Sequence, residues 1–320
     1  MEKICLTEHI HQDGGDLLRT KFEVVQATSA AEADVIAQAQ GCAGILVRSA
    51  KITDAVMAGV PTLRVVAKHG IGVDNIDVAA ATRRGILVVN APLSNVNAVA
   101  EHTVALILAA ARQLVLLDRL TRDGGFRKRD QYVTCELEGK TVGLLGLGRI
   151  SSLVAKKLSA FGVRLLASDP YLTPQRAEEL GVELVDMDTL LKESRFLSLH
   201  TPLTPDTKGM MGKAAFEKMR PDAWLVNASR GPVVDEAALC EALRTGQIAG
   251  AALDVFEEEP PADDDPLFAM DNVILSPHNA ALSDNALRAM AVDSAQGILD
   301  YLTGEKPRFP VNPDVLNRAD

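Results

Sequence analysis

From Gly139 onward the sequence alternates short apolar runs with turns and amphipathic segments, and this alternation constrains the fold more than any other feature. The pattern is typical of β–α–β units, in which helices connect parallel strands. The runs lack strict alternation of polar and apolar residues, as expected for strands that helices cover on both faces. We therefore predict a parallel sheet with strands at Val142–Leu145, Arg164–Ala167, Glu183–Val185, Phe196–Leu199, Trp224–Val226, Ala251–Val255 and Val273–Leu275.

The N-terminal part shows a looser version of the same alternation, which predicts a second, smaller α/β domain. Two long helical patterns run from Ser94 to Arg122 and from Asp284 to Leu302. The later one comes after the last predicted strand of the larger sheet, so we expect it to complete the smaller domain. We predict two Rossmann-like, doubly wound domains, at residues 1–96 with 285–320 and at 97–284. The smaller has predicted strands at Ile4–Leu6, Gly44–Val47, Val65–Ala67 and Leu87–Val89.

Composition and charge exclude several classes of function. The formal net charge is −10, from 33 Lys and Arg against 43 Asp and Glu, which disfavours binding to nucleic acid or to an anionic membrane surface. No apolar run approaches the ~18 residues of a membrane span, and the N-terminus lacks a signal-peptide core. We expect a cytoplasmic protein.

The cysteines are too scattered for a zinc site or a disulfide framework, so we expect no metal and four reduced thiols, Cys5, Cys42, Cys135 and Cys240.

A glycine-rich turn follows the first strand of the larger domain. The segment Gly146-Leu-Gly148-Arg-Ile-Ser151 lies between that strand and an amphipathic helical pattern. This context is typical of a dinucleotide-binding turn, in which the pyrophosphate rests on the helix N-terminus. Serine replaces the third glycine, and we expect looser packing of the helix rather than lost binding.

Asp169 follows the next strand about twenty residues later, where dinucleotide-binding folds carry an acidic residue that binds the adenosine ribose. A carboxylate there would repel the extra phosphate of NADP, so we predict NAD as the cofactor. The alternative is a pair of turn glycines and a surface aspartate, which the strand–turn–helix–strand order disfavours.

Seven segments, taken together, resemble the D-2-hydroxyacid dehydrogenases, and within that family the D-3-phosphoglycerate dehydrogenases. They follow the family's order along nearly the whole chain: Gly70-Ile-Gly-Val-Asp-Asn-Ile-Asp77, Ala100-Glu-His-Thr-Val104, Gly146-Leu-Gly-Arg-Ile150, His200-Thr-Pro-Leu-Thr204, Asn227-Ala-Ser-Arg-Gly231, Asp254-Val-Phe-Glu-Glu-Glu-Pro260 and Ser276-Pro-His278. The resemblance implies a short form without the C-terminal regulatory domain of longer phosphoglycerate dehydrogenases, and hence no inhibition by serine through such a domain.

The chemistry of 2-hydroxyacid oxidation needs a proton acceptor, a group that orients it and a cation for the carboxylate. His278, Glu259 and Arg230 each follow a predicted parallel strand, so they end at the same edge of the sheet. The resemblance assigns these roles to the same three residues. Taken singly, His278 could be an ordinary loop histidine, Glu259 part of a solvated acidic run, and Arg230 the partner of Asp235.

The resemblance also implies further cofactor contacts. Asp254 resembles the residue that contacts the nicotinamide carboxamide. Arg149 and Ile150 lie at the pyrophosphate turn. The remaining expected contacts are His200, Thr201 and Pro202 beside the adenine, and Ala228.

In the smaller domain, Gly70-Ile71-Gly72 resembles the loop whose backbone binds the substrate carboxylate. Arg48, Ser49 and Lys68 fall where phosphoglycerate dehydrogenases bind phosphate, although we would expect arginine at position 68. A basic cluster, Arg127-Lys128-Arg129, is either part of the pocket or a solvated loop.

Three functions remain open. The first is oxidation of 3-phosphoglycerate to 3-phosphohydroxypyruvate, as in serine biosynthesis. The second is reduction of glyoxylate, hydroxypyruvate or another small 2-keto acid. The third is an NAD(H)-sensing protein like the family's transcriptional corepressors. We expect a homodimer through the region of Ser94–Arg122.

Overall fold

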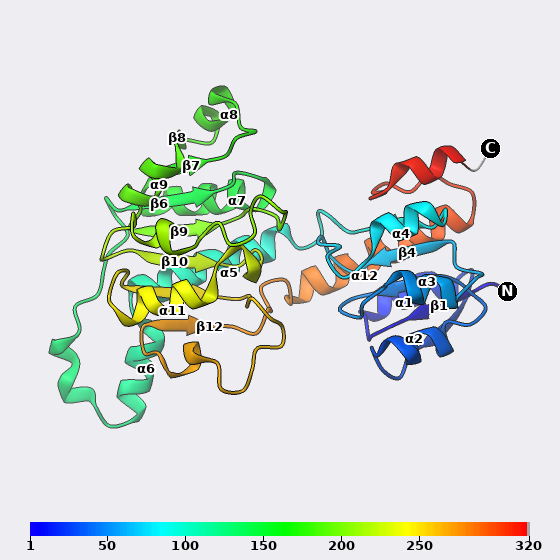
Figure 1. Cartoon of the computed structure of the whole chain (residues 1–320), viewed down its shortest axis with the longest axis horizontal. Coiled ribbons are helices and arrows are strands. Elements are labelled where there is room, and N and C mark those ends of the chain that lie inside the picture. Colours follow the sequence, from blue (N-terminus) through cyan, green and yellow to red (C-terminus); the bar gives the residue numbers. More distant parts are fainter. Residues whose placement is uncertain (319–320) are drawn as a thin grey trace. The chain divides into compact units, whose positions relative to one another are not determined.

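The computed structural model describes residues 1–318, which fall into two compact units (Figure 1). Unit 1 contains Met1–Val96 and the described chain from Ala281 onward, and unit 2 contains Asn97–Ala280. The division thus lies a few residues before the predicted boundary at 284/285. None of the described helices is long and apolar enough to cross a lipid bilayer.

Unit 2 is built on a seven-stranded sheet in the order β12-β11-β10-β9-β6-β7-β8, and all of its strand pairs are parallel. Two apolar clusters cover its faces: Val142 and Leu144 belong to one and Leu145 to the other. The strands are β6 (Thr141–Leu145), β7 (Arg164–Ser168), β8 (Glu183–Leu184), β9 (Phe196–Leu199), β10 (Trp224–Asn227), β11 (Gly250–Leu253) and β12 (Val273–Leu275). The helices are α5 (Val96–Ala111), α6 (Leu114–Arg122), α7 (Arg149–Leu158), α8 (Pro174–Glu179), α9 (Met187–Glu193), α10 (Lys213–Phe216) and α11 (Glu236–Arg244).

The strand order of unit 2 reverses at β6, which pairs with β7 on one side and β9 on the other. Connections leave such a strand in opposite directions, and open α/β sheets bind ligands in the crevice that results at the carboxyl ends. The turn at Gly146 follows β6 directly. The topology therefore places this turn at the expected position of a nucleotide.

Unit 1 contains a five-stranded parallel sheet in the order β2-β1-β3-β4-β5. Helix α12 (Asp284–Leu302) packs against α1 and β4, so the C-terminal helix completes this unit as expected. The strands are β1 (Lys3–Leu6), β2 (Glu23–Gln26), β3 (Cys42–Val47), β4 (Val65–Lys68) and β5 (Leu87–Val89). The other helices are α1 (Gln12–Arg19), α2 (Glu32–Gln38), α3 (Asp54–Gly59) and α4 (Val78–Arg83). The predicted fold class of two parallel-sheet α/β domains is confirmed.

Two elements differ from the prediction. Strand β2 was not predicted, because this edge strand has the sequence Glu-Val-Val-Gln and lacks a buried residue. The sequence predicts one helix from Ser94 to Arg122, whereas the structure has two, α5 and α6. Gln113 lies between them with a φ of 48°, which interrupts the helical backbone. A non-glycine residue rarely adopts this left-handed conformation.

Candidate active site

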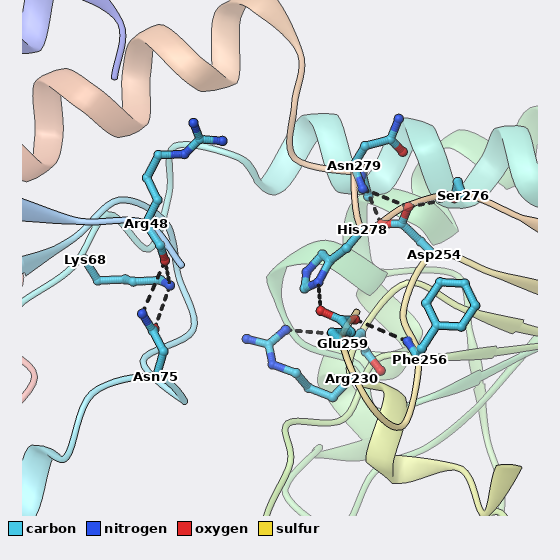
Figure 2. A network of polar contacts seen from close by, with 12 residues as sticks. Arg48, Lys68, Asn75, Arg230, Asp254, Phe256, Glu259, Ser276, His278 and Asn279 are labelled. Carbon is cyan, nitrogen blue, oxygen red and sulfur yellow. Dashed lines mark hydrogen bonds and ion pairs between the residues drawn. The ribbon is translucent and has the colours of Figure 1, made fainter. Parts of the chain in front are cut away.

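The three residues predicted for catalysis follow three neighbouring strands of unit 2. Arg230 follows β10, Glu259 follows β11 and His278 follows β12, and the sheet order brings these strand ends side by side. Figure 2 shows the imidazole of His278 against the Glu259 carboxylate, with the Arg230 guanidinium below it. Arg230 Nη1 donates to the Ser229 carbonyl at 2.7 Å. The distance from His278 Nδ1 to Glu259 Oε2 is 2.6 Å. This distance is slightly shorter than the roughly 2.7–2.9 Å typical of a charge-assisted N–H···O hydrogen bond.

The electrostatics of the cluster favour an ionised glutamate. Burial opposes ionisation of Glu259, but the hydrogen bond to His278 and the charges of His278 and Arg230 outweigh it, so its pKa is lowered. The amide of Phe256 also donates to Glu259 Oε1 at 3.2 Å. The side chains of His278 and Glu259 are 50% and 37% exposed. The imidazole can therefore meet a ligand while Glu259 fixes its orientation.

Gly231 allows the chain that carries Arg230 to pass close to the β11 loop. An ideal Cβ at Gly231 would lie 1.6 Å from the carbonyl oxygen of Phe256. Any side chain at this position would therefore push the Arg230 segment away from the segment that leads to Glu259.

Asp254 holds the turn that carries His278. The His278 amide donates to the Asp254 carbonyl at 2.8 Å, and the amides of Asn279 and Ala280 donate to Oδ1 and Oδ2 at 3.0 and 2.9 Å. His278 has a φ of 49°, a conformation that costs energy for a residue with a side chain. The three hydrogen bonds stabilise this turn and so position the imidazole.

A second histidine completes the surroundings of Asp254. Ser276 Oγ donates to Asp254 Oδ1 at 2.6 Å, and His102 Nε2 lies 3.0 Å from Ser276 Oγ. Burial opposes ionisation of Asp254, but its hydrogen bonds outweigh burial and lower its pKa. Since Asp254 is 0% exposed, its carboxylate serves the His278 turn. The expected contact of Asp254 with a nicotinamide stays a prediction.

Asp169 joins the glycine turn to the end of β7. Its Oδ2 accepts from the Leu147 amide and its Oδ1 from the Tyr171 amide, both at 2.8 Å. A carboxylate has further lone pairs, so Asp169 can still accept hydrogen bonds from a ribose.

The glycine turn has the space and the polar groups that NAD requires. Gly146 has a φ of +87°, and an ideal Cβ there would lie 3.2 Å from the His200 backbone. An ideal Cβ at Gly148 meets nothing within 4 Å, so the start of α7 borders open space. Thr201 Oγ1 is buried without a hydrogen-bond partner among the described residues. A helix N-terminus beside open space and an unpaired hydroxyl both suit a bound dinucleotide.

The other predicted cofactor residues lie around the same edge. Arg149 and Ile150 begin α7, His200 and Pro202 follow β9, and Ala228 follows β10. His200 Nε2 lies 3.0 Å from Ser198 Oγ, and burial lowers the pKa of this imidazole to about 4. A neutral His200 fits a role in packing. Ser151, at the third glycine position, is fully buried, and its Oγ donates to the Gly148 carbonyl at 3.3 Å.

The residues predicted to bind substrate in unit 1 lie at the carboxyl ends of β3 and β4. Arg48 Nη1 donates to the His9 carbonyl at 3.0 Å, and Lys68 Nζ donates to Asn75 Oδ1 at 2.7 Å. The carbonyls of Gly70 and Ile71 accept from Ala91 N at 2.9 Å and from Asn90 Nδ2 at 2.8 Å. These two hydrogen bonds hold the loop through its carbonyl groups. Gly72 is the next residue of the same loop.

Sequence reasoning missed three polar residues of these networks. Glu8 and Asn75 hold the Arg48 segment in unit 1, and His102 contacts Ser276 in unit 2. Glu8 could have been suspected, since it stands two residues after an apolar strand. No group of three potential metal ligands occurs among the described residues.

Comparisons with known proteins show which family the chain is part of. The family model for the D-isomer specific 2-hydroxyacid dehydrogenase, NAD binding domain, matches residues 104–280. The chain belongs to this family. Its NAD-binding domain accordingly coincides with most of unit 2.

Several relatives in the family carry assigned activities. The D-3-phosphoglycerate dehydrogenase of Archaeoglobus fulgidus is 42% identical over 99% of this chain and 60% of its own length. That of Mycobacterium tuberculosis is 46% identical over 85% of this chain and 51% of its own length. The chain thus spans between half and three-fifths of the length of these two relatives. The glyoxylate reductase of Thermococcus litoralis is 41% identical over 84% of this chain and 83% of its own length.

Solved structures of a dehydrogenase and of a reductase share the fold. The D-lactate dehydrogenase of Escherichia coli matches with a TM-score of 0.84 at 30% identity, covering 97% of this chain and 100% of the other. An NADPH-dependent glyoxylate/hydroxypyruvate reductase of Sinorhizobium meliloti matches with a TM-score of 0.87 at 32% identity, covering 97% of this chain and 96% of the other.

Proposed function

We propose that the protein is an NAD-dependent D-2-hydroxyacid dehydrogenase that oxidises 3-phosphoglycerate to 3-phosphohydroxypyruvate. The observation that carries this proposal is the 2.6 Å contact between His278 and Glu259 at the strand edge that also bears Arg230. It supplies a base, a group that orients the base and a cation, which the oxidation of a 2-hydroxyacid requires.

We propose a role for each side chain from this geometry. Glu259 engages Nδ1 of His278, so Nε2 is the atom that exchanges a proton with the C2 hydroxyl of the substrate. In oxidation Nε2 accepts that proton. The glycine turn would hold NAD, which would supply the acceptor for the hydride that leaves C2 with its electron pair. Arg230 binds the carboxylate and stabilises charge on the C2 oxygen, because a guanidinium presents several donors in one plane.

The cofactor preference rests on Asp169. Its carboxylate lies beside the glycine turn, where it would accept hydrogen bonds from the ribose hydroxyls of NAD and repel the 2′-phosphate of NADP. The preference thus differs from that of the NADPH-dependent relative from Sinorhizobium meliloti.

Phosphoglycerate is supported by Arg48 and by the relatives named as phosphoglycerate dehydrogenases. A second candidate is reduction of glyoxylate or hydroxypyruvate. Two observations favour this candidate. The Lys68 ammonium donates to Asn75 within unit 1, so it is engaged by the protein instead of a substrate phosphate. The chain also spans most of the length of the glyoxylate reductase of Thermococcus litoralis.

Absorbance of NADH with a panel of D-2-hydroxyacids and 2-keto acids tests the proposal. Fastest turnover of 3-phosphoglycerate supports the first function, and fastest turnover of glyoxylate or hydroxypyruvate supports the second. NADH binding without turnover of any panel member would refute both and favour an NAD(H)-sensing protein.

We also propose that the protein forms a homodimer through α5 and α6. Helix α6 has no buried residue, and its Leu114 and Val115 are 61% and 52% exposed. Exposed apolar side chains on one helix are typical of an interface between subunits. Isologous pairing of two copies would cover this surface on both.

A further inference from the structure

A carboxylate that follows β1 holds the segment Arg48-Ser49-Ala50 through its backbone. Glu8 Oε2 accepts from the Arg48 amide at 2.9 Å, and Oε1 accepts from the amides of Ser49 and Ala50 at 2.7 and 2.8 Å. The Ser49 hydroxyl donates to the same Oε1 at 2.7 Å. Consecutive amides that converge in this way form an anion-binding concavity. In this chain Glu8 fills it.

The carbonyl groups of the same segment are held from the other side. Lys68 Nζ donates to the Arg48 carbonyl, and Asn75 Nδ2 donates to the Ala50 carbonyl at 2.7 Å. Strand β3 lies between β1 and β4 in the sheet, so Glu8 and Lys68 reach the segment from its two neighbours. Figure 2 shows Lys68 and Asn75 meeting on one side of Arg48 while its guanidinium extends away from them.

Glu8 is ionised over the physiological range. Burial opposes its ionisation, but hydrogen bonds from Thr7, from Ser49 and from the Arg48 and Ser49 amides outweigh burial and lower its pKa to about 2. A permanently charged carboxylate in the concavity excludes a second anion from those amides. A substrate phosphate must therefore meet side-chain donors. The Ser49 hydroxyl already donates to Glu8, which leaves the Arg48 guanidinium as the group of this segment that we expect to bind phosphate.

We propose that Glu8 is a positioning residue that fixes the Arg48-Ser49-Ala50 segment so that the Arg48 guanidinium binds the substrate phosphate. Ser49 and Lys68 then support the segment, instead of binding phosphate as the family resemblance implies. This inference rests on the proposed function.

Glu8→Ala tests the inference, with Glu23→Ala as the control. Glu23 lies in the same unit and forms an exposed ion pair with Lys3. Misplaced binding groups can cost on the order of 10²-fold, and we expect Glu8→Ala to raise KM for 3-phosphoglycerate by at least about tenfold. KM for D-glycerate, which lacks the phosphate, and the affinity for NADH should match those of the control. Sodium formate should lower the raised KM relative to sodium chloride at equal ionic strength, because formate fits the emptied concavity.

A second comparison uses Ser49→Ala, a mild substitution at an exposed position. If Ser49 acts through Glu8, Ser49→Ala raises KM in the wild type and has no effect in the Glu8→Ala background. Additive effects would show that Ser49 binds the phosphate itself and would overturn the proposal, as would a KM in Glu8→Ala equal to that of the control. Wild-type protein that turns over no D-2-hydroxyacid refutes the proposed function and this inference together. An active wild type with unchanged KM in Glu8→Ala refutes the inference alone.

Discussion

The His278–Glu259 pair makes a quantitative prediction about the pH dependence of turnover. Oxidation needs a neutral imidazole, so kcat/KM for oxidation should rise with pH. Reduction needs the imidazolium and should fall over the same range. Burial opposes ionisation of Glu259, but the hydrogen bond from His278 and the charges of His278 and Arg230 outweigh burial and lower the pKa of this carboxyl group. Glu259→Gln removes the charge that holds the imidazole, so kcat/KM should fall in both directions.

The size of the expected fall in kcat/KM follows from the contact distance and the exposure of the two side chains. Two charges about 4 Å apart attract by about 1 kcal/mol in water and about 4 kcal/mol near a protein surface. With side chains 50% and 37% exposed, solvent screening places this pair toward the lower figure. A loss of about 1.4 kcal/mol lowers a rate about tenfold, so we expect Glu259→Gln to lower kcat/KM by roughly fivefold.

The assay is initial-rate absorbance of NADH in both directions across pH, with Glu258→Gln as the matched control. Glu258 is an exposed neighbour, and its substitution makes the same change in charge. His278→Ala should lower kcat on the order of 10² to 10⁴ while NADH affinity stays near that of the wild type. An equal fall in kcat/KM in Glu258→Gln and Glu259→Gln would mean that only net charge matters. Substantial turnover in His278→Ala would show that another group carries the proton.

Three further predictions concern separate parts of the chain. Asp169→Ala should weaken NAD binding, measured by titration, and narrow the preference for NAD over NADP; equal use of both cofactors by the wild type would contradict this role. Asp254→Asn should lower the free energy of unfolding by about 1–3 kcal/mol, since one buried amide then faces an NH₂ group, and should lower kcat through the loosened His278 turn. Unchanged denaturant midpoints would refute the buried network. Leu114→Glu should convert the dimer to a monomer in light scattering, whereas a wild type that is already monomeric would contradict the proposed interface.

The cluster of Arg230, Glu259 and His278 could be predicted because its position follows from the order of the strands. Each of Arg230, Glu259 and His278 follows an apolar run, and parallel strands bring such positions to one edge. The same reasoning located the glycine turn and Asp169. The predicted strands of unit 2 agree with the observed ones to within a few residues, because helices cover both faces and leave an apolar signal.

The features that the sequence did not predict leave no comparable apolar pattern in it. Strand β2 lies at an edge and buries no side chain. The break at Gln113 interrupts a leucine-rich stretch whose pattern continues across it. The partners of Glu8 are mostly backbone amides some forty residues away, and amides do not appear in a side-chain pattern. Asp254 was interpreted through resemblance as a cofactor contact, whereas its hydrogen bonds to Asn279 and Ala280 depend on a turn that only the structure shows.

The anchoring of the His278 turn through amides has a consequence for how this segment tolerates mutation. Asp254 binds the backbones of residues 278, 279 and 280 rather than their side chains. Substitutions at Asn279 can therefore accumulate without displacing the imidazole, provided that each new residue keeps its N–H. Proline is incompatible with this turn at positions 279 and 280, because it lacks the backbone N–H that donates to Asp254. Any redesign of this edge of the sheet should therefore keep the Asp254 carboxylate and the backbone N–H groups that donate to it.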